Sequence, residues 1–232
     1  MPLKVSELTS DEEFSGLMAT LYNSYSDPYN GFWDIFKGES EAECQARYMQ
    51  WHKADPTSHW IYVTDTETGQ IIGGTQWNIF EKNPYAVPNP PMAAYWIQEG
   101  SVFRSIADSV LNNFLAGRPH RMNRPHMLVM WCGTHSEHRR RGAGLMMMKW
   151  GLEKSDAMGL DSFVEATEAG YEMYKAAGFI TVDDFWADAE TDKPTQEWKN
   201  LKEELKFPMH GYFMWRPPGG RYEEGITKFP WE

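Results

Sequence analysis

The chain has few cysteines and no long apolar run. Its 232 residues include two cysteines, Cys44 and Cys132, which lie far apart in sequence and offer no disulfide framework of the kind that stabilises small secreted domains. No stretch reaches the roughly 18 apolar residues that a membrane-spanning helix needs, and the first residues lack the apolar core of a signal peptide. These absences predict a protein of the reducing cytoplasm without a membrane partner.

Basic residues are scarce relative to acidic ones. The sequence has 22 Lys and Arg against 33 Asp and Glu, which gives a formal net charge of -11. Proteins that bind nucleic acid meet its phosphates with a basic surface, so this balance predicts no nucleic-acid partner. A negative field is compatible with attracting a cationic substrate, and it also serves solubility.

The composition and the spacing of apolar residues predict a single α/β domain over residues 1–232. A hydrophobic fraction of 41% suffices for a sizeable core. The aromatic segment 27–33 is expected to be a turn, and insertions are expected at about 83–125 and 183–209. Apolar periodicity predicts helices over about 11–22, 41–53, 98–116, 145–158 and 197–205, and strands over about 4–8, 59–64, 70–80 and 127–132.

A basic, glycine-bearing turn is the most informative motif of the chain. It reads His138-Arg139-Arg140-Arg141-Gly142-Ala143-Gly144 and separates an expected strand from an expected helix. Glycine lets a ligand approach the backbone, and the unpaired amides at a helix start attract an anion such as phosphate. A P-loop is excluded because Leu145 and Met146 stand where it needs Lys and Ser or Thr. Met147 excludes the dinucleotide-binding fingerprint, which needs a third glycine there.

Two motifs in this order resemble the GCN5-related N-acetyltransferase (GNAT) superfamily. The first is Arg-x-x-Gly-x-Gly at residues 139–144, and the second is Tyr174-Lys175-Ala176-Ala177-Gly178-Phe179, about one βα unit later. Residues 163–167 and 212–218 also resemble GNAT proteins common in filamentous fungi. The resemblance implies an α/β fold with a central mixed, mostly antiparallel twisted sheet flanked by helices.

The resemblance also implies a site for acetyl-CoA, used as a cosubstrate without a metal. The main chain of the turn would hold the pyrophosphate, and the strand before it would pair with the pantetheine amides. Arg139 is the side chain that the motif places on phosphate, whereas Arg140 and Arg141 would reach the adenosine 3′-phosphate or solvent. Thr167 stands where many members have asparagine and offers a hydroxyl to the cofactor or the turn. The expected cofactor residues are Cys132, Gly133, Thr134, Arg139, Arg140, Arg141, Gly142, Ala143, Gly144, Thr167 and Tyr174.

Acyl transfer to an amine involves two proton steps. An alkylammonium with a pKa of about 10 must lose its proton before attack, and a departing thiolate with a pKa of about 8.5 gains from a donor. By resemblance, Tyr174 is the donor; the alternative is that it packs with Tyr171 on the buried face of a helix. Glu165 is the first choice for the proton acceptor, although a strand carboxylate is more often structural or solvated. Glu81, Glu99 and water are the alternates.

Cys132, His135 and His138 have spacings similar to those of metal ligands. Three side chains that leave a strand end seldom converge on one ion, and no fourth ligand is evident in the sequence. The same residues fit the cofactor strand and the loop after it. No metal is therefore expected.

The chain has eleven tryptophans. Some of them are candidates for the wall of a cleft that takes an aromatic or cationic acceptor, with ordinary packing as the alternative for each. The segments 27–33 and 83–97 are candidate lids over that cleft. The candidate tryptophans are Trp33, Trp77, Trp96 and Trp215.

These features predict an N-acetyltransferase that moves the acetyl group of acetyl-CoA to a primary amine of a small molecule, or of a peptide, by direct attack in a ternary complex. The alternatives are transfer of another acyl group, an oxygen acceptor, or a non-catalytic acyl-CoA-binding protein. The sequence leaves the acceptor and the oligomeric state open.

Overall fold

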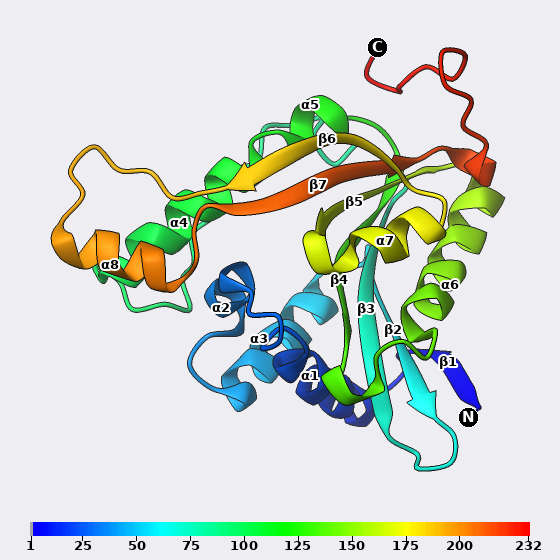
Figure 1. The fold of residues 1–232 in the computed structure, drawn as a ribbon, viewed down its shortest axis with the longest axis horizontal. Helices are drawn as coiled ribbons and strands as arrows, with labels where there is room; N and C mark the ends of the chain where they lie inside the picture. Colours follow the sequence, from blue (N-terminus) through cyan, green and yellow to red (C-terminus); the bar gives the residue numbers. More distant parts are fainter. Residues whose placement is uncertain (1) are drawn as a thin grey trace.

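The computed structural model describes residues 2–232 (Figure 1). Helices and strands alternate from β4 onward, and two short 3-10 turns lie at Ser136–His138 and Pro218–Gly220. The strands are β1 (Leu3–Glu7), β2 (Ser58–Asp65), β3 (Ile71–Phe80), β4 (His126–Thr134), β5 (Asp161–Thr167), β6 (Ile180–Ala187) and β7 (Met209–Arg216). The helices are α1 (Asp11–Ser24), α2 (Gly31–Lys37), α3 (Glu41–Ala54), α4 (Val102–Leu115), α5 (Arg118–Arg121), α6 (Ala143–Met158), α7 (Glu168–Ala176) and α8 (Gln196–Glu204).

All seven strands form one sheet in the order β1-β2-β3-β4-β5-β7-β6. β4 and β5 pair in parallel, whereas the other neighbours pair antiparallel. The expected mixed, mostly antiparallel sheet flanked by helices is confirmed. A parallel pair needs a crossover connection, and α6 supplies it between β4 and β5.

Helices cover both faces of the sheet. Trp60 and Tyr62 of β2 pack in a core with α1, α2 and α3, whereas Ile61 and Val63 pack in a second core with α6 and α7. Because successive strand residues point to opposite faces, a strand buried on both sides is apolar almost throughout. This burial explains why residues 60–63, in the middle of β2, form an unbroken apolar run.

α1 begins where the sequence predicts. The Ser10 hydroxyl accepts a hydrogen bond from the Glu13 amide at 3.3 Å, and the Glu13 carboxylate accepts one from the Ser10 amide at 3.2 Å. This reciprocal arrangement satisfies two donors that a helix start leaves open. Phe14, Leu17 and Leu21 then face the core, fully buried.

The expected turn at 27–33 is confirmed for Asp27 and Pro28, but its last three residues begin α2 instead. Asn30 caps the helix, since its Oδ1 accepts from the Trp33 amide at 2.9 Å, and Trp33 is 1% exposed. The segment Gly31–Lys37 is only two turns long and begins with glycine, which disfavours helix by propensity. Burial of its aromatic side chains overrides that propensity.

The parallel strands β4 and β5 separate part-way along their length. Their pairing runs from His126 and Asp161 to Val129 and Val164. Beyond that point β4 pairs with β3 and β5 pairs with β7. A register shift opposite Trp77 leaves Met130 as an extra residue of β4, and such bulges re-aim a strand. The result is an opening in the middle of the sheet.

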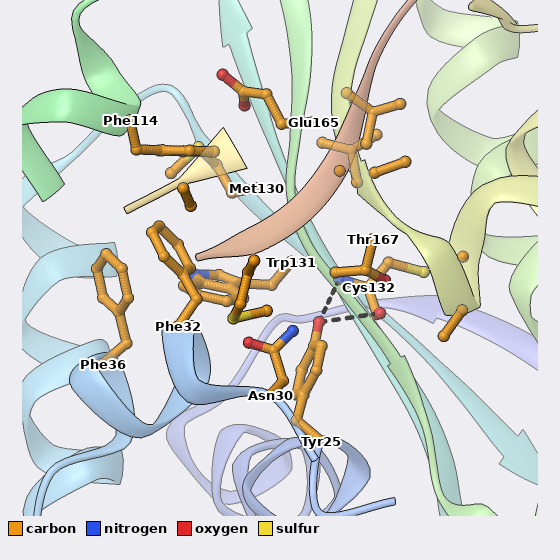
Figure 2. Close-up of a pocket in the computed structure, with 18 of the residues that line it drawn as sticks. Tyr25, Asn30, Phe32, Phe36, Phe114, Met130, Trp131, Cys132, Glu165 and Thr167 are labelled. Carbon is orange, nitrogen blue, oxygen red and sulfur yellow. Dashed lines mark hydrogen bonds between the residues drawn. The ribbon is translucent and has the colours of Figure 1, made fainter. Parts of the chain in front are cut away.

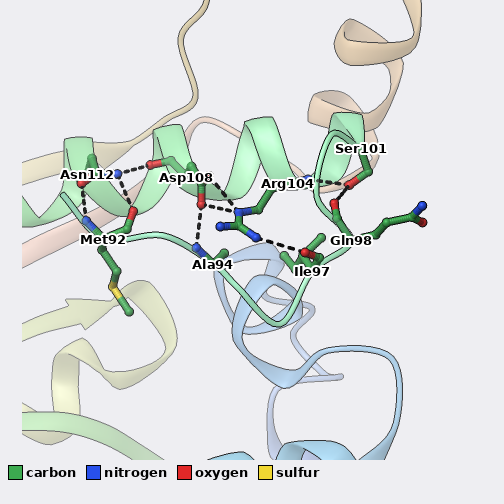
Figure 3. A network of polar contacts seen from close by, with 8 residues as sticks. All are labelled: Met92, Ala94, Ile97, Gln98, Ser101, Arg104, Asp108 and Asn112. Atoms are coloured by element: carbon green, nitrogen blue, oxygen red, sulfur yellow. Dashed lines mark hydrogen bonds and ion pairs between the residues drawn. The ribbon is translucent and has the colours of Figure 1, made fainter.

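The connection between β3 and β4 folds back onto α4 (Figure 3). Asp108 accepts from Arg104 at 2.8 Å and from the Ala94 amide at 2.6 Å, and the Asn112 amide group donates to the Met92 carbonyl at 2.8 Å. α4 begins after the Ser101 cap, four residues later than the expected start at 98. These contacts fix the connector, so one side of the central opening has a defined wall.

The second expected insertion, 183–209, begins later than predicted. β6 continues through Asp183 and Asp184 to Ala187, paired with β7. Acidic residues tolerate this position because both are exposed on an edge strand. The connection between β6 and β7 then carries α8, which packs against α4.

Among residues 2–232, no helix has the length and apolar character that crossing a bilayer requires.

Candidate active site

A cavity of about 1730 Å³ lies at the opening between β4 and β5. Typical small-molecule sites occupy about 300–1,000 Å³, so this one has room for two ligands. The cavity brings together all the sequence-predicted site residues except Arg141. The predicted residues that line it are Cys132, Gly133, Thr134, Arg139, Arg140, Gly142, Ala143, Gly144, Glu165, Thr167 and Tyr174.

The helix starts at one end of this cavity have no side-chain caps. Gly142, at φ 88°, precedes α6, and neither it nor Thr167, which precedes α7, caps its helix through a side chain. The amides of the first α6 turn therefore remain available to a ligand. Serine, asparagine or threonine caps the other longer helices, at Ser10, Asn30, Ser40, Ser101 and Thr195.

The three arginines of the turn have different partners. The Arg139 guanidinium donates to the Ser24 carbonyl at 2.8 Å and to the Thr134 carbonyl at 3.3 Å. This arrangement argues against the expected phosphate contact of its side chain, because those donors already tie the turn to the end of α1. Arg140 is exposed, has φ 64° and lines the cavity.

Arg141 is turned away from the cavity. It donates to the Asp65 carboxylate at 2.7 Å, and this hydrogen bond lowers the pKa of Asp65. Its other terminal nitrogen lies 3.0 Å from His138 Nδ1. Of the three arginines, Arg140 thus has its guanidinium most free for an anion, without a hydrogen-bond partner in residues 2–232.

Tyr25 occupies the main-chain groups of β4 at the opening, which the sequence did not predict. Its hydroxyl accepts from the Cys132 amide at 3.1 Å and donates to the Cys132 carbonyl at 3.0 Å (Figure 2). Burial raises the pKa of Tyr25 above its ordinary value, so the hydroxyl stays protonated. No sequence signal marks Tyr25, because it follows α1 in a segment with several other aromatic residues.

Tyr174 approaches Cys132 from the opposite face of the sheet. The phenol is 5% exposed, and the Cys132 thiol is close enough to influence its pKa. Burial, followed by the nearby Cys132 and Tyr25, raises the pKa of Tyr174 well above its ordinary value. Gly170 makes room for the ring, because a Cβ there would lie 2.9 Å from Tyr174 Cε2. The position suits a proton donor, and the ring also packs on Phe179 at 5.8 Å.

Glu165 is held in a buried ion pair. Both of its carboxylate oxygens accept from Arg118 at 2.8 Å, and the two side chains are 8% and 10% exposed. Burial alone would lower the pKa of Arg118, but Glu165 and Tyr85 more than offset it and raise that pKa. The pairing argues against Glu165 as the proton acceptor, because a proton on it would leave a buried guanidinium uncompensated. The alternates Glu81 and Glu99 do not line the cavity.

The other end of the cavity is an aromatic pouch. Ring centroids lie 4.7 Å apart for Phe32 and Phe114, and 5.0 Å apart for Phe36 and Trp131. Figure 2 shows these side chains on the α2 and α4 side of β4. The pouch is formed by Phe32, Phe36, Phe114, Met130, Trp131 and Phe185.

A family model described as "Acetyltransferase (GNAT) family" matches residues 18–179. The chain belongs to the GNAT family. Solved structures agree in fold: a histone acetyltransferase HPA2 and related acetyltransferase from Corynebacterium glutamicum is 16% identical, with a TM-score of 0.57 over 97% of this chain and 99% of that one. No protein with a curated description matches the sequence significantly.

Two further GNAT structures resemble this chain. A phosphinothricin acetyltransferase from Sinorhizobium meliloti in complex with AcCoA is 14% identical, with a TM-score of 0.53 over 99% of this chain and 98% of that one. The ribosomal-protein-S18-alanine N-acetyltransferase from Escherichia coli is 10% identical, with a TM-score of 0.50 over 98% and 100%. At these identities the likeness shows the fold alone.

The tryptophans named from the sequence do not line the cavity of this GNAT chain. Trp33, Trp77 and Trp215 are at most 2% exposed and belong to the cores, and Trp96 donates to the Ile35 carbonyl at 2.7 Å. Trp131 lines the cavity instead. The sequence signal for Trp131 was its position on the expected strand, directly before the cofactor residue Cys132. Neighbouring strand residues face opposite sides of a sheet, so a cofactor residue and a residue of the acceptor side can be adjacent in sequence.

The two histidines after β4 form a cluster of possible metal ligands that does not include Cys132. Potential ligand atoms of His135, Glu137 and His138 lie within 4.8 Å of one another. His138 Nδ1 already has Arg141 as a neighbour at 3.0 Å. The expectation that this GNAT chain uses no metal remains a prediction.

Proposed function

We propose that the protein transfers the acetyl group of acetyl-CoA to a primary amine of a small molecule by direct attack in a ternary complex. One observation carries the proposal: a single cavity joins an uncapped helix start to an aromatic pouch through the opening between β4 and β5. The first end fits a phosphate, and the second fits an organic acceptor.

The residues at the first end fit acetyl-CoA. Gly142 has open space where a Cβ would lie, so the backbone of the turn is accessible to the pyrophosphate. The free guanidinium of Arg140 adds charge for the phosphates. The main chain from Cys132 to Thr134 would pair with the pantetheine amides once the Tyr25 hydroxyl leaves the Cys132 amide and carbonyl.

Tyr174 supplies the proton that the leaving thiolate needs. A C–N bond forms between the amine and the acetyl carbon, and the nitrogen releases a proton to water as the C–S bond breaks. The sulfur takes the Tyr174 proton, and a proton from solvent restores the Tyr174 hydroxyl. A free thiol has a pKa of about 8.5, so proton transfer from a buried phenol is uphill unless it accompanies C–S cleavage. Tyr174 therefore acts during bond breaking, and its hydroxyl stays protonated between turnovers.

The test is the release of free thiol from acetyl-CoA with a panel of amines, paired with mass spectrometry of the acetylated product. We expect coenzyme A to raise the melting temperature, because a ligand of the native state stabilises it. Binding without thiol release would support a non-catalytic acyl-CoA-binding protein, and release with longer acyl thioesters alone would support another acyl group. A folded protein that does not bind coenzyme A at millimolar concentration contradicts the proposal.

A further inference from the structure

Within residues 2–232, each carboxylate that lines the cavity has a cationic or histidine partner. Among residues 2–232, three carboxylates line it, namely Glu165, Glu168 and Glu172. Glu165 is saturated by Arg118. Glu172 pairs with Lys175 at 3.5 Å on α7 and is 79% exposed, on the sheet face opposite the helices that carry the pouch.

Glu168 pairs with the one histidine that lines the cavity away from the phosphate turn. His210 Nδ1 lies 3.2 Å from Glu168, and His210 Nε2 lies 3.2 Å from Asp184. The contact with Glu168, then that with Asp184, raises the pKa of His210. Both ring nitrogens face a carboxylate, so neither is directed at an acceptor in the opening. His138, the other histidine, precedes the phosphate turn and contacts Arg141.

The remaining titratable groups of the cavity are equally unsuited to accept a proton. Burial raises the pKa of the Cys132 thiol to about 11. Burial likewise raises the pKa of Tyr25, Tyr29 and Tyr85 above the ordinary value, and of Tyr174 well above it. Near neutral pH these groups are protonated, so each is a proton donor rather than a base.

The pouch itself offers no anion. Asn30 lies beside it, but its Oδ1 accepts from the Trp33 amide, which leaves the amide nitrogen, a donor, facing the cavity. An alkylammonium that entered would lose water without gaining a carboxylate, at a large desolvation cost. Burial therefore disfavours the ammonium, and near pH 7 only the small free-base fraction of an alkylamine can enter and attack.

We propose that the acceptor is a primary aromatic amine, bound with its ring in the aromatic pouch and its nitrogen at the opening between β4 and β5. This inference rests on the proposed function and names its substrate class. An aromatic amine is neutral near pH 7 because its lone pair is delocalised into the ring, yet it remains nucleophilic. An alcohol or phenol of the same shape is neutral too, but it needs a base to attack, and the carboxylates and His210 that line the cavity in residues 2–232 are already paired.

The first test compares ring acceptors that differ in one property each. Aniline is neutral and flat, benzylamine is flat but cationic, cyclohexylamine is cationic and not aromatic, and phenol replaces nitrogen with oxygen. We expect kcat/KM for aniline to exceed that for benzylamine by at least about tenfold near pH 7 and to stay level from about pH 6 to about pH 9. The rate with benzylamine should rise about tenfold per pH unit over that range, since only its free-base fraction reacts.

The second test uses a matched pair of variants on α4. Phe114 lines the cavity. Phe103 is on the same helix but packs against the hydrophobic core and does not line the cavity. Phe114→Leu should raise KM for aniline about threefold to tenfold and leave KM for acetyl-CoA unchanged, because an aromatic contact is lost. Phe103→Leu should change neither constant.

The outcomes separate this inference from the proposed function. Faster turnover of benzylamine, cyclohexylamine or a polyamine than of aniline near pH 7 overturns the aromatic-amine assignment while keeping acetyl transfer to an amine. Acetylation of phenol in preference to aniline overturns it in favour of an oxygen acceptor. Absence of thiol release with every acceptor contradicts the proposed function itself.

Discussion

The two ends of the central cavity differ in whether their polar groups already have hydrogen-bond partners within the protein. At the turn end, the amides of the first α6 turn have no side-chain cap, and the Arg140 guanidinium is free. At the pouch end, Glu165 and Arg118 satisfy each other, and Asn30 caps α2. Unsatisfied donors prepare the first end for a polyanion. Satisfied groups and aromatic side chains prepare the second for a neutral, apolar ligand.

The two ends also differ in what lowers the stability of the protein. Leaving donors open lowers stability until a ligand satisfies them, and functional sites commonly carry such unsatisfied groups. A buried ion pair is tolerable only while both partners are present. We therefore expect the open backbone amides to provide affinity for the cofactor at one end. At the other end, the paired and aromatic side chains define the shape of the acceptor pocket.

Breaking the ion pair at the pouch end should have the largest effect. We expect Glu165→Gln to lower the free energy of unfolding by about 3–5 kcal/mol, because Arg118 stays buried without a counter-charge. Urea unfolding measures this loss. Glu153→Gln is the matched control: Glu153 pairs with Lys149 at 3.6 Å on the surface, where both are more than two-thirds exposed, so little should change.

The same variant separates a structural Glu165 from a catalytic one. If Glu165 only pairs with Arg118, the pH-rate profile of Glu165→Gln keeps its shape, and combining Glu165→Leu with Arg118→Met restores much of the stability. Loss of the acidic limb, with rescue as the pH approaches the pKa of the amine, would return the proton acceptor to Glu165.

Removing the Tyr174 hydroxyl should have the next largest effect. Tyr174→Phe keeps the buried ring but removes the proton, so we expect turnover to fall about 10–100-fold with little change in coenzyme A affinity. Because the raised pKa keeps Tyr174 protonated, turnover of the unaltered protein should show no alkaline decline below about pH 10. Tyr171→Phe is the control. Tyr171 is on the same helix, its hydroxyl accepts a hydrogen bond from Thr181 at 3.0 Å, and it does not line the cavity. Full turnover in Tyr174→Phe would make the residue a packing group.

Distorting the turn end should have a smaller effect, confined to the cofactor. Gly142 has φ 88° with open space at its Cβ position, so Gly142→Val strains the backbone and obstructs the approach of phosphate. We expect coenzyme A to bind about tenfold more weakly by calorimetry, a cost of about 1.4 kcal/mol.

Two controls isolate that effect. Gly159 ends the same helix at φ 67°, also with open space, so Gly159→Val carries similar strain away from the cavity and should lower stability without weakening coenzyme A binding. Arg140→Ala should weaken binding less than Gly142→Val, because the backbone amides remain. Equal losses in both glycine variants would attribute the effect to helix stability.

The sequence predicted the turn end far better than the pouch end. Residues 139–144 and 174–179 are contiguous motifs whose chemistry depends on backbone conformation, which local sequence encodes. The pouch is assembled from α2, α4, β4 and β6, and such tertiary contacts leave no local pattern. The Arg118–Glu165 pair joins residues 47 apart, so sequence showed a strand carboxylate but not its partner.

The smallest effect concerns Tyr25, which lies between the two ends. Its hydroxyl occupies the Cys132 amide and carbonyl that the pantetheine is expected to use, so cofactor binding must displace it. Tyr25→Phe removes this competitor and should tighten coenzyme A binding about twofold to fivefold, while the lost hydrogen bonds lower the free energy of unfolding by about 1 kcal/mol. Calorimetry and urea unfolding measure the two changes, which have opposite signs. Weaker binding of coenzyme A by Tyr25→Phe would show instead that the hydroxyl is a cofactor ligand, and the turn end would then extend across the opening to α1.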